Sequence, residues 1–262
     1  MAIHCHRSGH EAKALARAIQ AAGVRATILE ADLADAAAVS SIIAQAGAAL
    51  GPLTLLVNNA SVFEPDDIGS LDEVGWERHF GVNLRAPVFL ARDFAAQLPH
   101  GVDGAIINVI DQRVWKPTPH FLSYTLSKSA LLTATQTMAQ ALAPRIRVNA
   151  VGPGPTLASS RQRRDDFARQ GASVPLGHGP SPEEIAEAVL FLATARSVTG
   201  QMIATAVSIS PGRPRMFSRP PNDRGVLGTS GTRRIQSAPR IGTRMLESDV
   251  QSAPADCASA EG

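Results

Sequence analysis

The sequence is poor in cysteine, in tyrosine and in long apolar runs, and its charges nearly balance. Cys5 and Cys257 are the only cysteines and lie at opposite ends of the 262 residues, which excludes a disulfide framework and a cysteine metal cluster. A formal net charge of +2 is too small to indicate nucleic acid or a membrane surface as a partner. No apolar run reaches the roughly 18 residues of a membrane-spanning helix, and the first residues lack the layout of a signal peptide. We therefore expect a soluble, cytoplasmic protein.

Short apolar runs alternate with helical patterns up to about residue 209. Strands are expected at 1–6, 25–33, 53–60, 104–110, 146–155 and 200–209, and helices at 10–23, 36–50, 70–98, 123–143 and 181–194. Strands that alternate with helices of this length indicate a parallel sheet covered on both faces. The sequence therefore predicts one doubly wound α/β domain over residues 1–209. Ser181 and Glu184 predict a capping box at the start of the last helix, with Pro182 in its first turn.

Residues 210–262 have a different composition, dense in proline, glycine, serine and arginine and without apolar periodicity. Such a segment buries too little apolar surface to offset the entropy of ordering it. We expect a disordered tail. The alternative is that its arginines contact nucleic acid or an acidic partner.

Tyr124, the only tyrosine, precedes Lys128 by four residues, and Asp111 directly follows an apolar run. Residues four apart lie on one helix face. A nearby ammonium favours the phenolate and would lower the tyrosine pKa from about 10 toward the range useful for proton transfer. We therefore interpret the three residues as a proton-transfer site. The alternatives are a pair on a helix surface and a carboxylate that ends a strand.

Several motifs surround these residues in a fixed order. They are "NNAS" (58–61), "VNL" with Asn83, "IINVID" ending on Asp111, "YTLSK" (124–128) and "RVNAVGPGPT" (147–156). Together they make residues 1–204 resemble the short-chain dehydrogenase/reductase family. The resemblance implies that Tyr124 donates a proton to the reduced substrate atom and that Lys128 holds the nicotinamide ribose and depresses the tyrosine pKa. It also implies that Asn83 binds a water molecule of a proton relay, and that the protein forms a homo-oligomer.

One departure from the family pattern narrows the resemblance. Asp111 stands where the family usually has a serine, and an Asp-Tyr-Lys set resembles the pteridine reductases, which reduce C=N bonds of pterins with NADPH. Phe63 matches the aromatic residue that stacks on the pterin in those enzymes. The alternative for Phe63 is a place in the domain core. Another enzymatic interpretation is a ketone or 3-oxoacyl reductase that uses the same Tyr124 and Lys128.

The resemblance also implies which residues contact the cofactor. Arg7 and Ser8 supply a cation and a hydroxyl that suit the 2′-phosphate of NADPH. Ser8 has an alternative role, a capping box with Glu11, and Asp32 has the alternative of turning the chain. The further expected contacts are Asp32 and Leu33 near the adenine, Asn59, Ala60 and Ser61 after the third strand, Lys128, and Pro153, Gly154 and Thr156 over the nicotinamide. Residues 161–170 fall where the family has a mobile substrate lid, unless they form a solvated helix face.

The family's first unit, a strand followed by a glycine-rich turn and a helix, has no counterpart in this chain. Its glycines allow the backbone to approach a pyrophosphate. Without the unit we expect exposed strand edges and apolar helix faces.

The sequence also departs from the family after Ala204. We expect a late start and a shifted reading frame at the end of the coding sequence. The alternative to a reductase is a protein without catalytic activity that cannot hold the cofactor.

Overall fold

The computed structural model describes residues 1–157, 169, 171, 172 and 174–206. The predicted tail at 210–262 and most of the predicted lid at 161–170 lie outside these residues. Within the described residues, no helix combines the length and the apolar character that a membrane span requires. The same residues contain no group of three or more His, Cys, Asp or Glu side chains suited to a metal ion.

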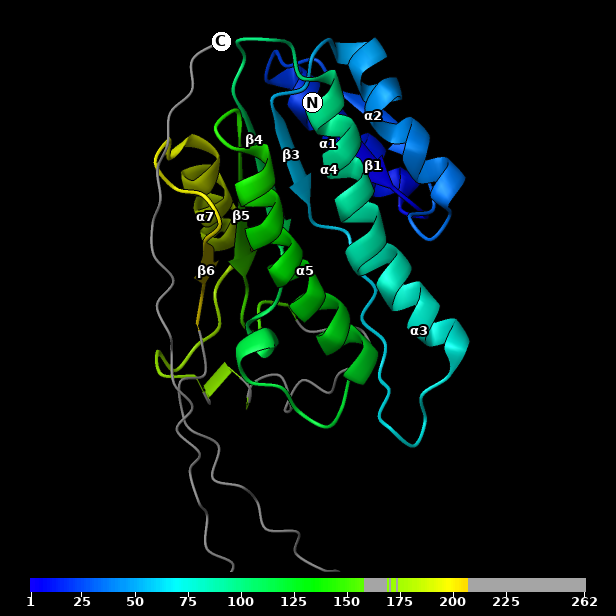
Figure 1. Cartoon of the computed structure of the whole chain (residues 1–262), viewed down its shortest axis with the longest axis vertical. Helices are drawn as coiled ribbons and strands as arrows, with labels where there is room; N and C mark the ends of the chain where they lie inside the picture. The colour runs from blue at the N-terminus through cyan, green and yellow to red at the C-terminus, as the bar shows by residue number, and fades with distance from the viewer. Residues whose placement is uncertain (158–168, 170, 173, 207–262) are drawn as a thin grey trace, which may run out of the picture. The chain divides into compact units, whose positions relative to one another are not determined.

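Strands and helices alternate in the predicted order (Figure 1). The strands are β1 (Ala2–Cys5), β2 (Thr27–Glu30), β3 (Leu55–Asn58), β4 (Gly104–Val109), β5 (Ile146–Gly152) and β6 (Met202–Ala204). The helices are α1 (Gly9–Ala21), α2 (Ala36–Leu50), α3 (Glu73–Phe80), α4 (Ala86–Gln97), α5 (Leu122–Leu142) and α7 (Pro182–Thr194). A π-helical turn, η1 (Gly81–Arg85), joins α3 to α4, and a 3-10 turn, η2 (Gln112–Trp115), follows β4. The single helix predicted at 70–98 is therefore α3, η1 and α4 in succession.

Local capping explains where several helices begin. The side chains of Asp35 and Asp72 accept hydrogen bonds from backbone N–H groups in the first turns of α2 and α3. The predicted capping box of α7 is confirmed, because Ser181 Oγ accepts from the Glu184 N–H at 3.2 Å and the Glu184 carboxylate accepts from the Ser181 N–H at 2.7 Å. The capping box proposed for Ser8 is wrong, because the Ser8 side chain makes no capping hydrogen bond to α1.

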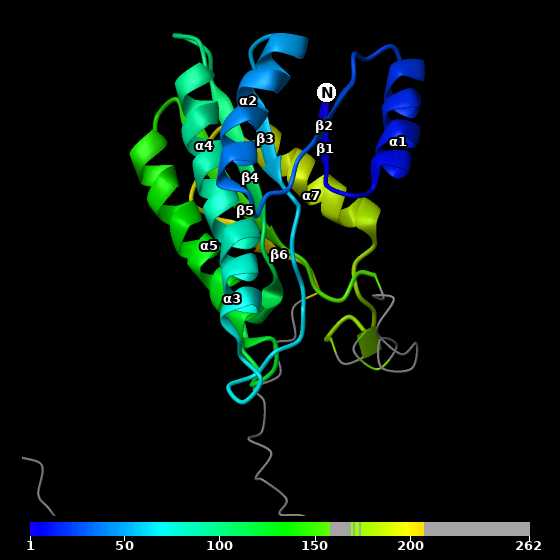
Figure 2. The same cartoon turned by 90° about the vertical axis from the view of Figure 1, so that its right-hand side faces the viewer.

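All the strand pairings in the described residues are parallel, as the sequence predicts. β1 pairs with β2, and β3, β4, β5 and β6 form a second sheet in that order. Helices α2, α4 and α5 lie along one face, and α1 and α7 lie on the other (Figure 2). The largest core cluster packs α2 and α4 against the sheet, with Phe94, Ile106 and Val148 fully buried at its centre. The fold is a doubly wound, Rossmann-like α/β domain.

The sheet is interrupted between β1 and β3, which are not hydrogen bonded to each other. A cavity of about 720 Å³ lies beside both strands and is lined mainly by apolar residues of β1, β3, α2 and the start of α4. Leu55 and Val57 of β3 remain 46% and 39% exposed. The expectation that a missing strand–helix unit leaves open strand edges and apolar faces is confirmed, and the Rossmann-like fold is incomplete at this position.

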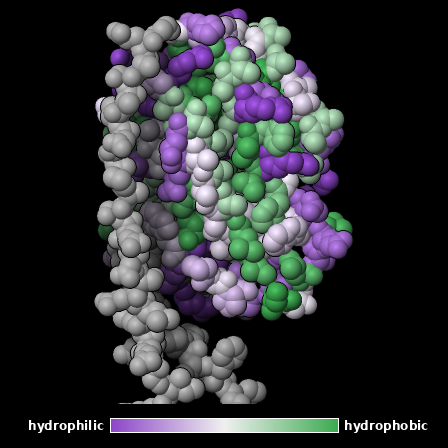
Figure 3. Space-filling view, in the orientation of Figure 1, coloured by the Kyte–Doolittle hydropathy of each residue, from purple (hydrophilic) through white to green (hydrophobic). Residues whose placement is uncertain are grey.

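The helical face that contains α4 and α5 has a mixed surface. Figure 3 shows hydrophobic and hydrophilic residues interspersed over it. Phe89 of α4 is 44% exposed and Leu126 of α5 is 41% exposed. The exposed ring of Phe89 is partly covered by the guanidinium of Arg92, 4.8 Å from the ring centroid.

Candidate active site

The structure brings Asp111 and Tyr124 into direct contact. Asp111 follows the carboxyl end of β4, and Tyr124 lies in the first turn of α5 with only 6% of its surface exposed. The Tyr124 hydroxyl donates a hydrogen bond to Asp111 Oδ2 at 2.8 Å. The other carboxylate oxygen, Oδ1, accepts from the Arg113 N–H at 2.8 Å and caps η2. The carboxylate therefore ends a strand and contacts the phenol at the same time.

Lys128 lies one turn further along α5 and is almost completely buried. Its Nζ donates to the Val109 carbonyl at 2.7 Å and lies 5.9 Å from the centroid of the Tyr124 ring. Burial lowers the pKa of Lys128 to about 8, and the negative charge of Asp111 opposes this shift. The three residues of the predicted set thus share one site, with the ammonium directed at a backbone carbonyl.

The pKa of Tyr124 differs from the sequence-based expectation. Burial, followed by the negative charge of Asp111 and the hydrogen bond to it, raises the pKa of the Tyr124 hydroxyl well above its ordinary value. The positive charge of Arg113 offsets part of this rise. The pKa is thus raised and not depressed, first because the hydroxyl is buried and second because the charge in contact with it is the Asp111 carboxylate. Tyr124 therefore retains its proton at neutral pH.

Asn83 lies in η1 and is fully buried. Its Oδ1 accepts from the Val62 N–H at 2.8 Å and from the Ser61 hydroxyl at 3.1 Å. Its Nδ2 donates to the Val62 carbonyl at 2.9 Å and to the Ser127 hydroxyl at 3.1 Å. These four contacts use the full hydrogen-bonding capacity of the side-chain amide. The side-chain amide therefore holds the backbone that follows β3, and the water contact expected of Asn83 stays a prediction.

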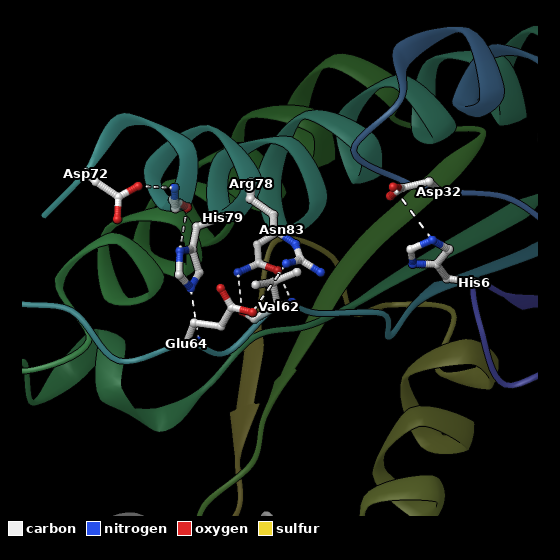
Figure 4. Close-up of polar contacts among 9 residues, drawn as sticks. His6, Asp32, Val62, Glu64, Asp72, Arg78, His79 and Asn83 are labelled. Atoms are coloured by element: carbon white, nitrogen blue, oxygen red, sulfur yellow. Dashed lines mark hydrogen bonds and ion pairs between the residues drawn. The ribbon is translucent and has the colours of Figure 1, made fainter. Parts of the chain in front are cut away.

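The loop from residue 60 to residue 66 is fixed at two further points, which the sequence reasoning missed. Buried His79 accepts a hydrogen bond at Nε2 from the Glu64 N–H at 3.2 Å, and its Nδ1 bonds the Gly75 carbonyl at 2.8 Å (Figure 4). The Asp66 carbonyl accepts a hydrogen bond from the Phe121 N–H at 2.7 Å. The Asp66 carboxylate accepts one from the Ser123 N–H at 3.1 Å. The Ser123 hydroxyl donates to the same carboxylate. The loop therefore connects α3 to the start of α5.

These hydrogen bonds hold a cluster of aromatic rings next to Tyr124, the residue that contacts Asp111. Phe63 stacks on Phe121 with ring centroids 4.4 Å apart and an angle of 4° between the planes. Phe63 also lies against Tyr124, with ring centroids 4.7 Å apart and an angle of 74° between the planes. Phe63 is 42% exposed, so the alternative that placed it in the domain core is wrong. Phe121 has a left-handed backbone conformation with φ of 61°, unusual for a residue other than glycine.

The residues expected near the nicotinamide occupy loops after β3 and β5. Asn59, Ala60 and Ser61 are exposed directly after β3. After β5, the Pro153 carbonyl accepts from the Gln112 N–H at 3.2 Å, and the Gly154 N–H donates to the Thr205 carbonyl at 2.9 Å. A Cβ atom at Gly154 would lie 2.8 Å from the Ala206 carbonyl oxygen, so only glycine fits there. Thr156 closes the turn by donating to the Gly154 carbonyl at 3.0 Å.

The residues expected near the adenosine surround the end of β1 and the turn after β2. Arg7 and Ser8 are exposed. Asp32 accepts from the Ala34 N–H at 2.9 Å, which turns the chain, and its other oxygen lies 3.7 Å from His6 Nε2 (Figure 4). Asp32 therefore forms the turn after β2, which was the alternative role expected for it. Leu33 is buried in the main core cluster, so its side chain is committed to packing.

Comparison of the chain with known proteins identifies its family. The family model described as enoyl-(acyl carrier protein) reductase matches residues 2–206. A short-chain type dehydrogenase/reductase of Picea abies is 31% identical over 210 residues, which cover 73% of this chain and 75% of that protein. This chain belongs to the short-chain dehydrogenase/reductase family. The resemblance indicated by its sequence motifs is confirmed, and the protein is an oxidoreductase of that family.

Two further similar proteins are a bacterial relative of the chain and a crystal structure that contains NADP. The uncharacterized oxidoreductase YjdA of Bacillus subtilis (strain 168) is 34% identical over 187 residues, covering 69% of this chain and 74% of that protein. The crystal structure of FolM alternative dihydrofolate reductase 1 from Brucella canis, complexed with NADP, is 51% identical. The match has a TM-score of 0.76 and covers 79% of this chain and 82% of that chain.

Proposed function

We propose that this protein is an NADPH-dependent reductase that reduces a C=N bond of a pterin. The single observation that carries the proposal is the 2.8 Å hydrogen bond between Tyr124 and Asp111 beside the exposed Phe63 ring. A carboxylate in contact with the phenol provides a second group that can pass on protons, which a serine does not. The 51% identity to an alternative dihydrofolate reductase complexed with NADP supports the same assignment.

The residues at the two ends of the expected cofactor site suit NADPH. A buried ammonium is stable when acceptors surround it, and Lys128 has the Val109 carbonyl as its hydrogen-bond acceptor, so the hydroxyls of a ribose would complete its contacts. Arg7 and Ser8 are exposed, and the Ser8 hydroxyl makes no capping hydrogen bond, so both side chains are available to a 2′-phosphate. When bound, NADPH supplies the hydride, which adds to the carbon of the C=N bond.

Tyr124 and Asp111 would supply the proton that balances this addition. The raised pKa of Tyr124 keeps its hydroxyl protonated, so the phenol would hold a proton that it can give to the nitrogen of the C=N bond. Asp111, already hydrogen bonded to the phenol, returns a proton from solvent to it. The exposed Phe63 ring lies nearly perpendicular to the Tyr124 ring, 4.7 Å away between centroids, so a flat heterocycle that contacts Phe63 would lie beside the proton donor.

Two other functions make different predictions. A ketone or 3-oxoacyl reductase would use Tyr124 and Lys128 and would not need a carboxylate at residue 111. The family description names an enoyl-(acyl carrier protein) reductase, and the acyl carrier that its substrate shares with 3-oxoacyl thioesters is the observation that favours this alternative. A non-catalytic protein would not bind NADPH, and the lack of hydrogen bonds between β1 and β3 in the described residues is the observation that favours it.

Titration calorimetry with NADPH is the first experiment, because failure to bind would exclude both reductases. Turnover of dihydrobiopterin and of a 3-oxoacyl thioester then separates them. We expect Asp111→Ser to slow pterin reduction by about 100-fold, the lower end of what a positioned acid–base group contributes. Asp103→Ser, at an exposed loop position, is the matched control. Faster turnover of the thioester, with no effect of Asp111→Ser, would refute the pterin assignment.

We also propose that the protein forms a homo-oligomer through the face of α4 and α5. Phe89 and Leu126 expose apolar surface there, and such surface is stabilised when a second copy covers it. Light scattering coupled to size-exclusion chromatography measures the oligomeric state directly. Leu126→Glu should shift the protein to a smaller species, whereas a wild-type monomer would refute the proposal.

A further inference from the structure

Arg113 lies at the rim of the aromatic cluster and has no part in the chemistry proposed above. It is the second residue of η2, and its backbone position is fixed by the hydrogen bond from its N–H to Asp111 Oδ1 at 2.8 Å. Its guanidinium carbon lies 5.0 Å from the centroid of the Phe121 ring and 5.7 Å from that of Phe63. One cation therefore contacts both rings of the stack.

The positive charge of Arg113 is not neutralised by a carboxylate of the described residues. The ion pairs in that part of the chain involve His6, Arg78 and Arg92. The two acids that flank the aromatic cluster have other partners: the Asp66 carboxylate binds the start of α5, and Asp111 binds the Tyr124 hydroxyl. The Arg113 guanidinium, which carries five N–H donors, donates to the Thr118 hydroxyl at a long 3.4 Å.

We propose that Arg113 is a specificity-determining residue that binds a carboxylate on the side chain of a flat heteroaromatic substrate. The inference rests on the proposed function, because it takes the pterin ring to contact Phe63. A guanidinium suits this task, since its planar donors match both oxygens of a carboxylate while its face remains on an aromatic ring. The substrate class is thereby narrowed to pterins that carry an acidic substituent, in preference to neutral ones.

The electrostatic reach of Arg113 agrees with this placement. Its charge lowers the pKa of Tyr124 against the larger effects of burial and of Asp111, so the guanidinium lies within electrostatic reach of the proton donor. An anionic group bound to Arg113 would reduce that effect. The bound acid would therefore favour the protonated form of Tyr124, the form that donates.

The test compares two probes that share a pterin ring. Dihydrofolate carries a glutamate tail, and dihydrobiopterin carries no carboxylate. Their binding to the full chain with NADPH would be measured by titration calorimetry for wild type, Arg113→Gln and Arg113→Lys. Arg92→Gln is the matched control. Arg92 also lies over a phenylalanine ring, that of Phe89, but it belongs to α4 and not to η2. KM and kcat for both pterins provide the second readout.

We expect Arg113→Gln to weaken dihydrofolate binding by about tenfold, the loss typical of one charge-assisted hydrogen bond. Dihydrobiopterin binding should change by less than about twofold on the same scale, and Arg113→Lys should restore part of the dihydrofolate affinity. Added salt should weaken dihydrofolate binding to wild type more than to Arg113→Gln, because salt screens the ion pair.

Three results would overturn the inference. Equal weakening of both pterins by Arg113→Gln would assign Arg113 to support of the Phe63 and Phe121 rings alone. Unchanged dihydrofolate binding would remove Arg113 from the site. Failure of wild type to bind either pterin would refute the proposed function, and the role of Arg113 with it, and this outcome is visible before any variant is made.

Discussion

Replacement of Lys128 by methionine tests whether a buried ammonium lowers the stability of this fold. The side chain is 2% exposed, and burial lowers its pKa from 10.5 to about 8. One pKa unit corresponds to about 1.4 kcal/mol. The shift therefore corresponds to a cost of about 3 kcal/mol at pH 7, where the ammonium is charged in both the folded and the unfolded state.

The sign of the pH dependence follows from the direction of the shift. Between the folded pKa of about 8 and the unfolded value of 10.5, the unfolded state binds more protons at Lys128 than the folded state does. The stability of the wild type therefore rises with pH in this window, as the cost of burying the charge is relieved. Methionine has no charge to bury, so the Lys128→Met variant gains nothing from the same change in pH.

The expected difference at pH 7 combines two effects. The variant avoids the cost of about 3 kcal/mol but loses the hydrogen bond to the Val109 carbonyl, which contributes about 1 kcal/mol. Lys128→Met should thus be more stable than wild type by about 2 kcal/mol at pH 7. By pH 9.5 the wild type should recover about 2 kcal/mol, and the two proteins should unfold at similar urea concentrations.

Urea unfolding followed by circular dichroism at pH 7, 8.5 and 9.5 measures the difference, and taking a difference cancels titrations shared by both proteins. Lys13→Met, at an exposed position of α1, is the control and should show no such pH dependence. A stability difference between wild type and Lys128→Met that stays constant from pH 7 to 9.5 would refute the reasoning. So would a variant that is less stable than wild type at pH 7.

Two further predictions concern the ends of helices. Ser181→Ala removes one half of the capping box of α7 and should lower the free energy of unfolding by about 1 kcal/mol, measured by urea denaturation; an unchanged midpoint would contradict the role of the cap. Asp66→Ala leaves the Ser123 N–H and its buried hydroxyl without their acceptor and should lower the free energy of unfolding by about 2 kcal/mol. Asp66→Asn keeps an acceptor oxygen and should recover part of that loss, and equal losses in the two variants would argue against a hydrogen-bonding role.

The outcome at Tyr124 shows what a sequence motif leaves out. The spacing of Tyr124 and Lys128 predicts that both side chains lie on one helix face, and they do. The direction of the pKa shift depends on which charge contacts the hydroxyl and on how much water is excluded. Both are set by the packing of α5 against β5 and η2, which places the Asp111 carboxylate 2.8 Å from the phenol and the ammonium beside the Val109 carbonyl.

The sequence alone determined the order of strands and helices, because apolar periodicity and caps act over a few residues. It also determined the family and the Asp111, Tyr124 and Lys128 set, which rest on ordered motifs. Only the tertiary structure decided that Asn83 and His79 hold the Phe63 loop and that Asp66 caps α5. Asp66 and Ser123 are 57 positions apart in the chain, and no local pattern relates residues at that separation. Contacts of this kind arise from packing between elements, so they become visible only in the folded chain.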